Sequence, residues 1–371
     1  MSSNEKNIDK IFLGTVIILL IVGFVIFISA SMSILAKDSI QFASITLKQI
    51  FFGIILGLIA CFIFSKIDYK IFKKYALSIF IGSIILTSSV FISSLGTNLN
   101  TFATRWISIF GFTFQPVAVL NIGFIIYWSA WLSSIKEKVS TFKYGFLPLI
   151  VIIAIAAGLL LSQPDTDSFL ILAATCIAMF MVAGGKKRYI AILIAIGFVC
   201  LAALAITRPY VMSRLETYMH PGDNSQTSGY QIQQSLIAIG SGEVFGKGLG
   251  QSIQKYKFLP ESISDTIFAV LAEEVGFIGC IFVIGLFLFF VFRGFRIAIR
   301  SPDTFGGLLV VGIVILTALQ SFTNIASVLG IIPFSGLPLV FFSQGGTAML
   351  LVLVQIGIVL NVSKFGKTFK V

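Results

Sequence analysis

Residues 11–34 read IFLGTVIILLIVGFVIFISASMSI, and this run contains no Asp, Glu, Lys or Arg. About 20 apolar residues in a helix span the hydrocarbon core of a bilayer. The apolar region of a signal peptide is shorter and is followed by a cleavage site between small residues. This run is longer than such a region and no clear cleavage site closes it, so it predicts a first transmembrane helix rather than a signal peptide.

Comparable apolar runs recur along the whole chain. Of its 371 residues, 57% are hydrophobic and 11% are charged, whereas soluble domains have about 45–50% apolar and roughly 25% charged residues. The composition therefore predicts an all-α, polytopic membrane protein that forms a single domain over residues 1–371. We expect about ten spans, near 11–34, 47–65, 76–94, 116–134, 145–162, 168–184, 189–207, 266–292, 305–328 and 345–362.

Lysine and arginine predict the orientation of these spans. With the N-terminus inside, the short inner segments hold 18 of the 26 basic residues, as the positive-inside rule requires. Both termini are then cytoplasmic, and a long segment between spans seven and eight, at about 208–265, lies outside. The net charge of +11 follows from this arrangement beside anionic lipid, and it gives no reason to expect a nucleic-acid partner.

The long outer segment contains two readable features. Residues 230–239 read YQIQQSLIAI, in which Ile232, Leu236 and Ile239 form one helical stripe, and they predict a short helix that lies at the membrane surface or re-enters the membrane. Residues 240–251 read GSGEVFGKGLGQ. A phosphate-binding loop needs Ser or Thr after Gly-Lys, but Gly248 stands there, so these glycines predict tight turns.

The residues around this segment resemble those of the SEDS family, which includes FtsW, RodA and SpoVE. The resemblance rests on residues 229–279, on RWI at 105–107, on FQP at 114–116, on QPD at 163–165, and on NIASVLGIIPFSGLPLVFFSQGG at 324–346. These motifs occur in the family's order over nearly the whole chain. The form GKGLGQSIQK at 246–255 is closer to FtsW than to RodA.

The resemblance implies a function. SEDS proteins are peptidoglycan glycosyltransferases of the bacterial cytoplasmic membrane. They polymerise lipid II on its outer face and release undecaprenyl diphosphate, here during cell division. The implied partners are a class B penicillin-binding protein, which is the transpeptidase, together with divisome or elongasome proteins and membrane lipid. A divalent cation, Mg or Mn, is implied as well, and no organic cofactor is expected.

The same resemblance selects candidate site residues. Glycosyl transfer needs a base for the acceptor hydroxyl, and Asp265 matches the family's essential aspartate; the alternative is a helix cap. Arg105 and Trp106 match a family pair that would bind substrate; the alternative is an anchor at the membrane interface. Asp165 is a candidate to orient substrate or metal, or else a turn residue. Three lysines are candidates for the diphosphate by charge alone: Lys247, Lys255 and Lys257.

Four positions depart from the family pattern. A histidine is replaced by Ile263, a tyrosine by Gln344, and a glutamate and lysine three residues apart by Ala118 and Asn121. These changes leave open a degenerate, non-catalytic partner that scaffolds a penicillin-binding protein. A lipid II flippase is a further alternative. It needs a polar path, for which Glu273 and Glu274 are the acidic pair inside the spans.

Overall fold

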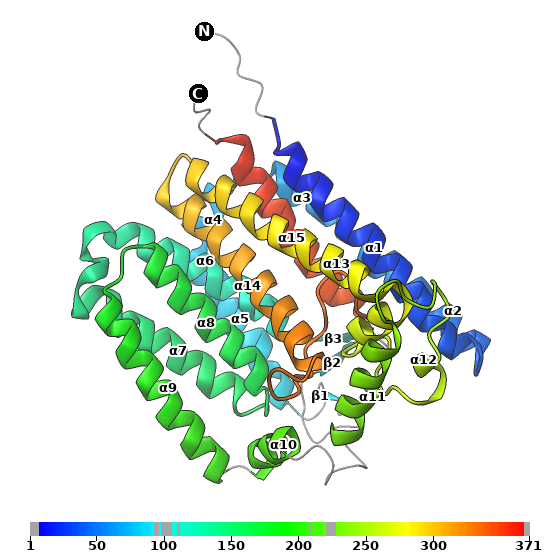
Figure 1. Cartoon of the computed structure of the whole chain (residues 1–371). Helices are drawn as coiled ribbons and strands as arrows, with labels where there is room; N and C mark the ends of the chain where they lie inside the picture. Colours follow the sequence, from blue (N-terminus) through cyan, green and yellow to red (C-terminus); the bar gives the residue numbers. More distant parts are fainter. Residues whose placement is uncertain are drawn as a thin grey trace.

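The computed structural model describes residues 7–92, 96–97, 106–109, 112–207, 209–219 and 228–366. Helices dominate this part of the chain, which confirms the all-α prediction (Figure 1). The helices before the first outer loop are α1 Lys10–Leu35, α2 Ser39–Lys48, the π-helix η1 Gln49–Ile55, α3 Leu56–Lys66, α4 Lys70–Lys74 and α5 Ala76–Ser88. The next are α6 Val117–Ile135, the π-helix η4 Phe142–Phe146, α7 Leu147–Leu160, α8 Thr166–Val182 and α9 Lys187–Thr207. The last are α10 Pro209–Met219, α11 Ser228–Ser241, α12 Gln254–Lys257, α13 Ile267–Arg300, α14 Thr304–Val328 and α15 Gly346–Lys364.

Each predicted apolar run coincides with a helix. Seven helical segments are long and apolar enough to cross a membrane, and two shorter apolar helices cover Ala76–Phe91 and Thr166–Val182. The helix α9 occupies the remaining run. The number of spans stays a prediction, because length and composition alone do not place a helix in a bilayer.

Two boundaries differ from the prediction for identifiable reasons. The second helical segment begins at Ser39 rather than near 47, because the Asp38 carboxylate accepts hydrogen bonds from the first-turn amides of Ile40 and Gln41. It then continues through η1 into α3 without a break. The helix α13 runs on to Arg300 rather than ending near 292, so Arg293, Arg296 and Arg300, which are among the 18 inner basic residues, lie on its last turns.

A small sheet that the sequence analysis did not predict lies in the first long outer loop. It consists of β1 Gly96–Thr97, β2 Trp106–Ile109 and β3 Phe112–Phe114, in antiparallel order β1-β2-β3. The register pairs Thr97 with Trp106 and Ile107 with Phe114. Propensity was a weak guide here, since such short strands gain stability mainly from cross-strand contacts.

The two ends of the helical bundle are distinct. Where α1 begins and α15 ends, the Asp9 amide donates to Ser363 Oγ at 3.0 Å, and Arg293 pairs with Asp9 at 2.9 Å. The first and last helices therefore meet at one end (Figure 1). The sheet, α10, α11 and α12 gather toward the other end.

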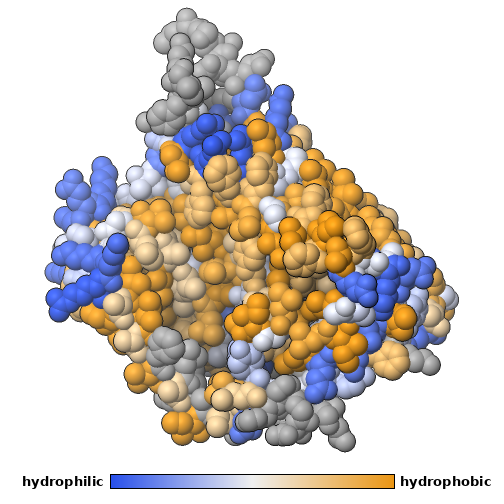
Figure 2. Space-filling view, in the orientation of Figure 1, coloured by the Kyte–Doolittle hydropathy of each residue, from blue (hydrophilic) through white to orange (hydrophobic). Residues whose placement is uncertain are grey.

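Apolar side chains cover much of the surface between these ends (Figure 2). Many large ones are well exposed, among them Ile21 at 59%, Phe62 at 60% and Phe277 at 62%. Contiguous exposed apolar surface of this kind marks a face that water does not wet. The core lies deeper, where α14 packs against α6, α8, α13 and α15.

Candidate functional site

Asp265 lies in a turn that leads into α13. The N-cap position of α13 is Thr266, whose side chain makes no capping hydrogen bond. Thr266 Oγ1 instead donates to the Pro260 carbonyl oxygen at 2.8 Å. The helix-cap alternative for Asp265 therefore finds no support in the geometry, since another residue holds that position.

Hydrogen bonds to three consecutive carbonyl oxygens fix the backbone of this turn. Asn324 Nδ2, on α14, donates to the Asp265 carbonyl oxygen at 2.7 Å. Ser343 Oγ donates to the Ser264 carbonyl oxygen at 2.6 Å, and the Gln344 amide donates to the Ile263 carbonyl oxygen at 2.8 Å. The turn is thus held between α14 and the loop that precedes α15.

The Asp265 carboxylate has an unusual electrostatic environment. Burial is the largest cause that raises its pKa, from an ordinary 3.8 to about 7, and the charges of Glu261 and Asp167 add to it. A hydrogen bond from Ser264 and the charge of Arg214 lower the pKa in part. Glu261 adopts a φ of 51°, a left-handed conformation that is costly for such a residue and recurs at functional sites. A carboxylate with a pKa near neutrality suits a general base, because it holds a proton strongly yet is ionised in a large fraction of molecules.

An ion pair that sequence reasoning missed belongs to the same region. Arg214 Nη1, on α10, lies 2.7 Å from Asp167 Oδ2, in the first turn of α8. Both charges act on Asp265. No periodicity or motif could have found this pair, because its members are 47 residues apart on helices with unrelated patterns.

Asp165 is buried at the start of α8. Its carboxylate accepts a hydrogen bond from the Ser168 amide at 3.3 Å, so it caps that helix. The structure thus gives this residue a structural role beside the predicted one. Its place two residues before Asp167 brings it to the helix end that carries the ion pair.

The predicted pair in the first outer loop is described in part. Trp106 begins β2 and is partly buried. Arg105 lies outside the described residues. The substrate-binding prediction for both stays a prediction.

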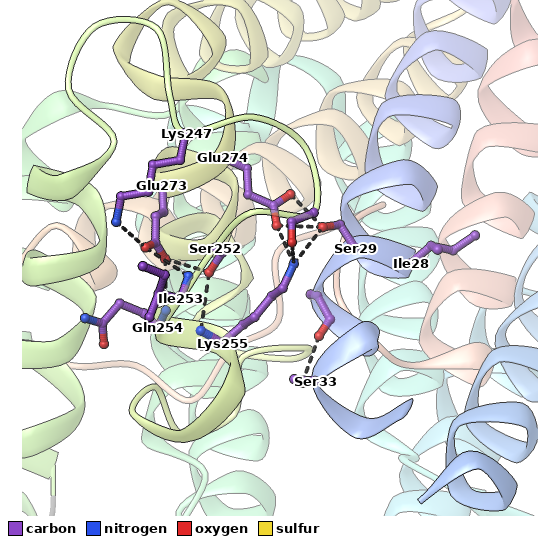
Figure 3. Close-up of polar contacts among 12 residues, drawn as sticks. Ile28, Ser29, Ser33, Lys247, Ser252, Ile253, Gln254, Lys255, Glu273 and Glu274 are labelled. Carbon is purple, nitrogen blue, oxygen red and sulfur yellow. Dashed lines mark hydrogen bonds and ion pairs between the residues drawn. The ribbon is translucent and has the colours of Figure 1, made fainter. Parts of the chain in front are cut away.

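Two of the three lysines predicted to bind diphosphate have other partners (Figure 3). Lys247 Nζ lies 2.7 Å from Glu273 Oε1, and Lys255 Nζ lies 2.7 Å from Glu274 Oε1. The side chains of Lys255 and Glu274 are both fully buried. This geometry favours a structural role for the two lysines over substrate binding. Of Lys257, the structure describes the backbone, in the last turn of α12.

Two of the four departures from the family pattern lie against each other. The hydrogen bond between the Gln344 amide and the Ile263 carbonyl oxygen joins them directly beside Asp265. Ala118 and Asn121 are partly buried on the first turns of α6. The Asn121 Oδ1 atom is buried and has no hydrogen-bond partner among the described residues.

The residues that the structure describes do not form a cage for a metal ion. Among the described side chains, no group of three or more His, Cys, Asp and Glu could hold one. The divalent cation that the resemblance implies thus has no cage among these side chains, and it stays a prediction.

Comparisons with known proteins agree with this architecture. The profile of the family described as "Cell cycle protein", which groups FtsW, RodA and SpoVE, matches residues 9–368. A probable peptidoglycan glycosyltransferase FtsW from Geobacter is 36% identical over 96% of this chain and 97% of its own length. Stage V sporulation protein E from Bacillus subtilis is 34% identical over 99% and 100%, respectively.

A solved structure shares the fold. One chain of a peptidoglycan synthase complex that coordinates polymerization and crosslinking aligns with a TM-score of 0.79 and 22% identity. The alignment covers 96% of this chain and 97% of that one. With the profile match and the two full-length relatives, it leads to one assignment: the chain belongs to the FtsW/RodA/SpoVE family of cell cycle proteins.

Proposed function

We propose that this chain is a peptidoglycan glycosyltransferase that polymerises lipid II into glycan strands and releases undecaprenyl diphosphate. The names of its full-length relatives support the activity. The observation that carries the proposal is the Asp265 carboxylate, which the turn before α13 holds partly buried and whose pKa is raised to about 7.

In this mechanism Asp265 is the general base. Its ionised carboxylate accepts the proton of the acceptor sugar hydroxyl while the oxygen attacks the anomeric carbon of the donor. The bond from that carbon to the diphosphate breaks, and undecaprenyl diphosphate leaves with the electron pair. Arg214 carries a positive charge close enough to act on Asp265, and we assign it as the cation beside the leaving diphosphate. Arg105 and Trp106 are assigned as substrate contacts.

The orientation belongs to the same proposal. Lipid II is used on the outer face of the bacterial cytoplasmic membrane, so the end with the sheet and Asp265 faces outward. The end where α1 begins and α15 ends then faces the cytoplasm with both termini, as the distribution of basic residues favours.

We further propose a class B penicillin-binding protein as the partner, within the division machinery. The fold neighbour from a synthase complex that joins polymerization to crosslinking supports such a pairing. A divalent cation stays part of the proposal only as a companion of the substrate diphosphate, since Mg²⁺ is commonly held by one or two carboxylates and substrate phosphates.

The flippase alternative gains nothing from the geometry. Glu273 and Glu274, which could have lined a polar path, are already bonded to Lys247 and Lys255. The deciding experiment supplies lipid II in detergent, where no membrane barrier exists, to the purified chain with its penicillin-binding protein. We expect glycan strands from the parent and none from Asp265→Asn. Absence of product from the parent, with lipid II scrambling in liposomes, would favour the flippase.

A further inference from the structure

The helix that follows Asp265 is broken one-third of the way along. Within α13, Gly276 has φ 66° and ψ −168°, so the chain forms a short first segment over 267–275 and a longer second segment from Phe277. A Cβ at Gly276 would overlap the amide nitrogen of Gly246. Glycine is therefore needed here both for its backbone conformation and for the close approach of another segment.

The segment that approaches is the loop 243–248, and it restores the hydrogen bonds that the break removes. The amides of Lys247 and Gly248 donate to the carbonyl oxygens of Glu273 and Glu274, both at 3.0 Å. On the other side, the Phe277 amide donates to the Glu243 carbonyl oxygen at 2.9 Å. Helix ends buried without such partners would be costly, so the loop and the break form one unit.

Two glutamates at the end of the first segment of α13 fasten this unit through their side chains (Figure 3). The Glu274 carboxylate accepts from Lys255 Nζ at 2.7 Å and from Ser29 Oγ, on α1, at 2.6 Å. Lys255 Nζ also donates to Ser29 Oγ at 3.1 Å and to the Gly250 carbonyl oxygen at 2.9 Å. All three protons of the ammonium group are therefore used.

Glu273 fastens the outer loop in the same way. Its carboxylate accepts from Lys247 Nζ at 2.7 Å and from Ser252 Oγ at 2.6 Å. It also accepts from the amides of Ile253 and Gln254, where α12 begins, at 3.1 and 3.3 Å. One carboxylate thus joins α13 to the turn and to the helix that carries Lys255.

We propose that two sets of bonded residues, Glu274–Lys255–Ser29 and Glu273–Lys247, act as positioning residues for Asp265. We call the two sets together the clamp. The first segment of α13 is a buried rod, exposed by 2% or less at each residue from Ile267 to Glu274. Asp265 stands just beyond one end of this rod and the clamp holds the other. The clamp therefore fixes the axial position and the rotation of this rod relative to α1, and through them the position of the Asp265 carboxylate. This inference rests on the proposed role of Asp265 as the base.

Charge pairs are suited to this task. Apolar residues of similar volume often replace a buried ion pair without loss of stability, so stability alone does not account for the clamp. Its directional bonds, in contrast, fix the orientation and the register of α13 against its neighbours. A slip of one residue along a helix is a movement of about 1.5 Å. A misplacement of about 1 Å at a catalytic group can cost about 10²-fold in rate.

The test removes both charges of one pair together. The variant Lys255→Met with Glu274→Gln leaves no buried charge unpaired. We expect a folded protein whose kcat for lipid II polymerisation falls about 10- to 100-fold while KM stays within about threefold, because only the alignment in the transition state is lost. The midpoint of the acid limb of its pH profile should also move. Leu19→Ala, a buried change on the same helix as Ser29, is the matched control and should alter neither kcat nor the midpoint.

A second variant keeps the inference falsifiable. Ser29→Ala removes one hydroxyl and leaves the charges paired, so it tests the clamp even if the double variant does not fold. We expect its kcat to be about three- to tenfold lower than that of the parent. A folded double variant, or Ser29→Ala, with parental kcat and pH profile would overturn the inference. If Asp265→Asn is inactive in that case, the proposed function stands and only the clamp's role fails. If Asp265→Asn is active, the proposed role of Asp265 itself is wrong.

Discussion

The replacement Asp265→Asn should have opposite effects on stability and on activity. The pKa of Asp265 rises from 3.8 in an ordinary environment to about 7 in the folded protein. Moving a pKa by one costs about 1.4 kcal/mol, so ionising this carboxylate costs at most about 4.5 kcal/mol, and partial exposure to water lowers that figure. The sign follows from proton linkage. Asp265 does not lower the free energy of unfolding below pH 3.8, lowers it increasingly as the pH rises toward 7, and lowers it by a constant amount above pH 7.

Asparagine carries no charge and escapes this cost. We therefore expect the Asp265→Asn variant to have a higher Tm than the parent at pH 8, and a difference that shrinks toward pH 4. Polymerisation should fall by about 10²–10⁴-fold, the usual contribution of a general base. The parent's rate should rise with pH, with a midpoint near 7. The measurements are thermal unfolding in one detergent at pH 5 and pH 8, and gel analysis of glycan strands formed from lipid II.

A second aspartate provides the control. Asp303 caps α14 through a 2.7 Å hydrogen bond from the Gly306 amide, at the opposite end of the bundle from Asp265. Losing such a cap costs about 0.5–2 kcal/mol, so Asp303→Ala should lower the Tm and leave polymerisation unchanged. The reasoning about Asp265 is refuted if Asp265→Asn lowers the Tm at pH 8 as Asp303→Ala does, or if its rate stays within a few-fold of the parent's.

Three further predictions follow from the site, the family pattern and the topology. Arg214→Ala should move the midpoint of the acid limb to higher pH, because the charge of Arg214 lowers the pKa of Asp265; adding Asp167→Asn should move it back, and an unchanged midpoint in both would contradict the electrostatic account. Ala118→Glu alone should lower the Tm, whereas Ala118→Glu with Asn121→Lys should be tolerated; equal stability of the single and double variants would show that the two positions do not pair. A cysteine at Asn224 should be labelled from outside the cell, and labelling only from the cytoplasmic side would reverse the proposed topology.

The helical bundle could be predicted because its cause is local. A run such as 11–34 contains enough apolar residues to fill a bilayer whatever its neighbours are, and α1 occupies it closely. The short helix predicted at 230–239 was also confirmed, as α11. Its apolar stripe is not its buried face, since Ile232 and Ala238 are buried while Leu236 is 45% exposed. A stripe of apolar residues predicts that a helix forms better than it predicts which face of the helix is buried in the protein.

The clamp could not be predicted, because its bonds join residues far apart in sequence. Lys255 and Ser29 are separated by 226 positions, and neither stands in a charge pattern. The lysines were predicted to bind the diphosphate by charge alone, and nothing in the sequence pairs them with Glu273 and Glu274. Nor did the pattern around Gly276 reveal the break in α13, because AEEVGFIG, at 272–279, lies inside the single span predicted near 266–292.

The departures from the family pattern are best judged by which atoms place Asp265. The bonds that hold the turn end on carbonyl oxygens of Ile263, Ser264 and Asp265 itself. A carbonyl oxygen is present whichever side chain the residue carries, so isoleucine in place of histidine at 263 leaves the bond from the Gln344 amide intact. The donor, the amide of Gln344, is also a backbone group, so the replacement of tyrosine by glutamine leaves this bond intact as well. The two departures therefore change the lining beside the carboxylate and not its position, which favours an enzyme with an altered pocket over a scaffold that has lost its catalytic group.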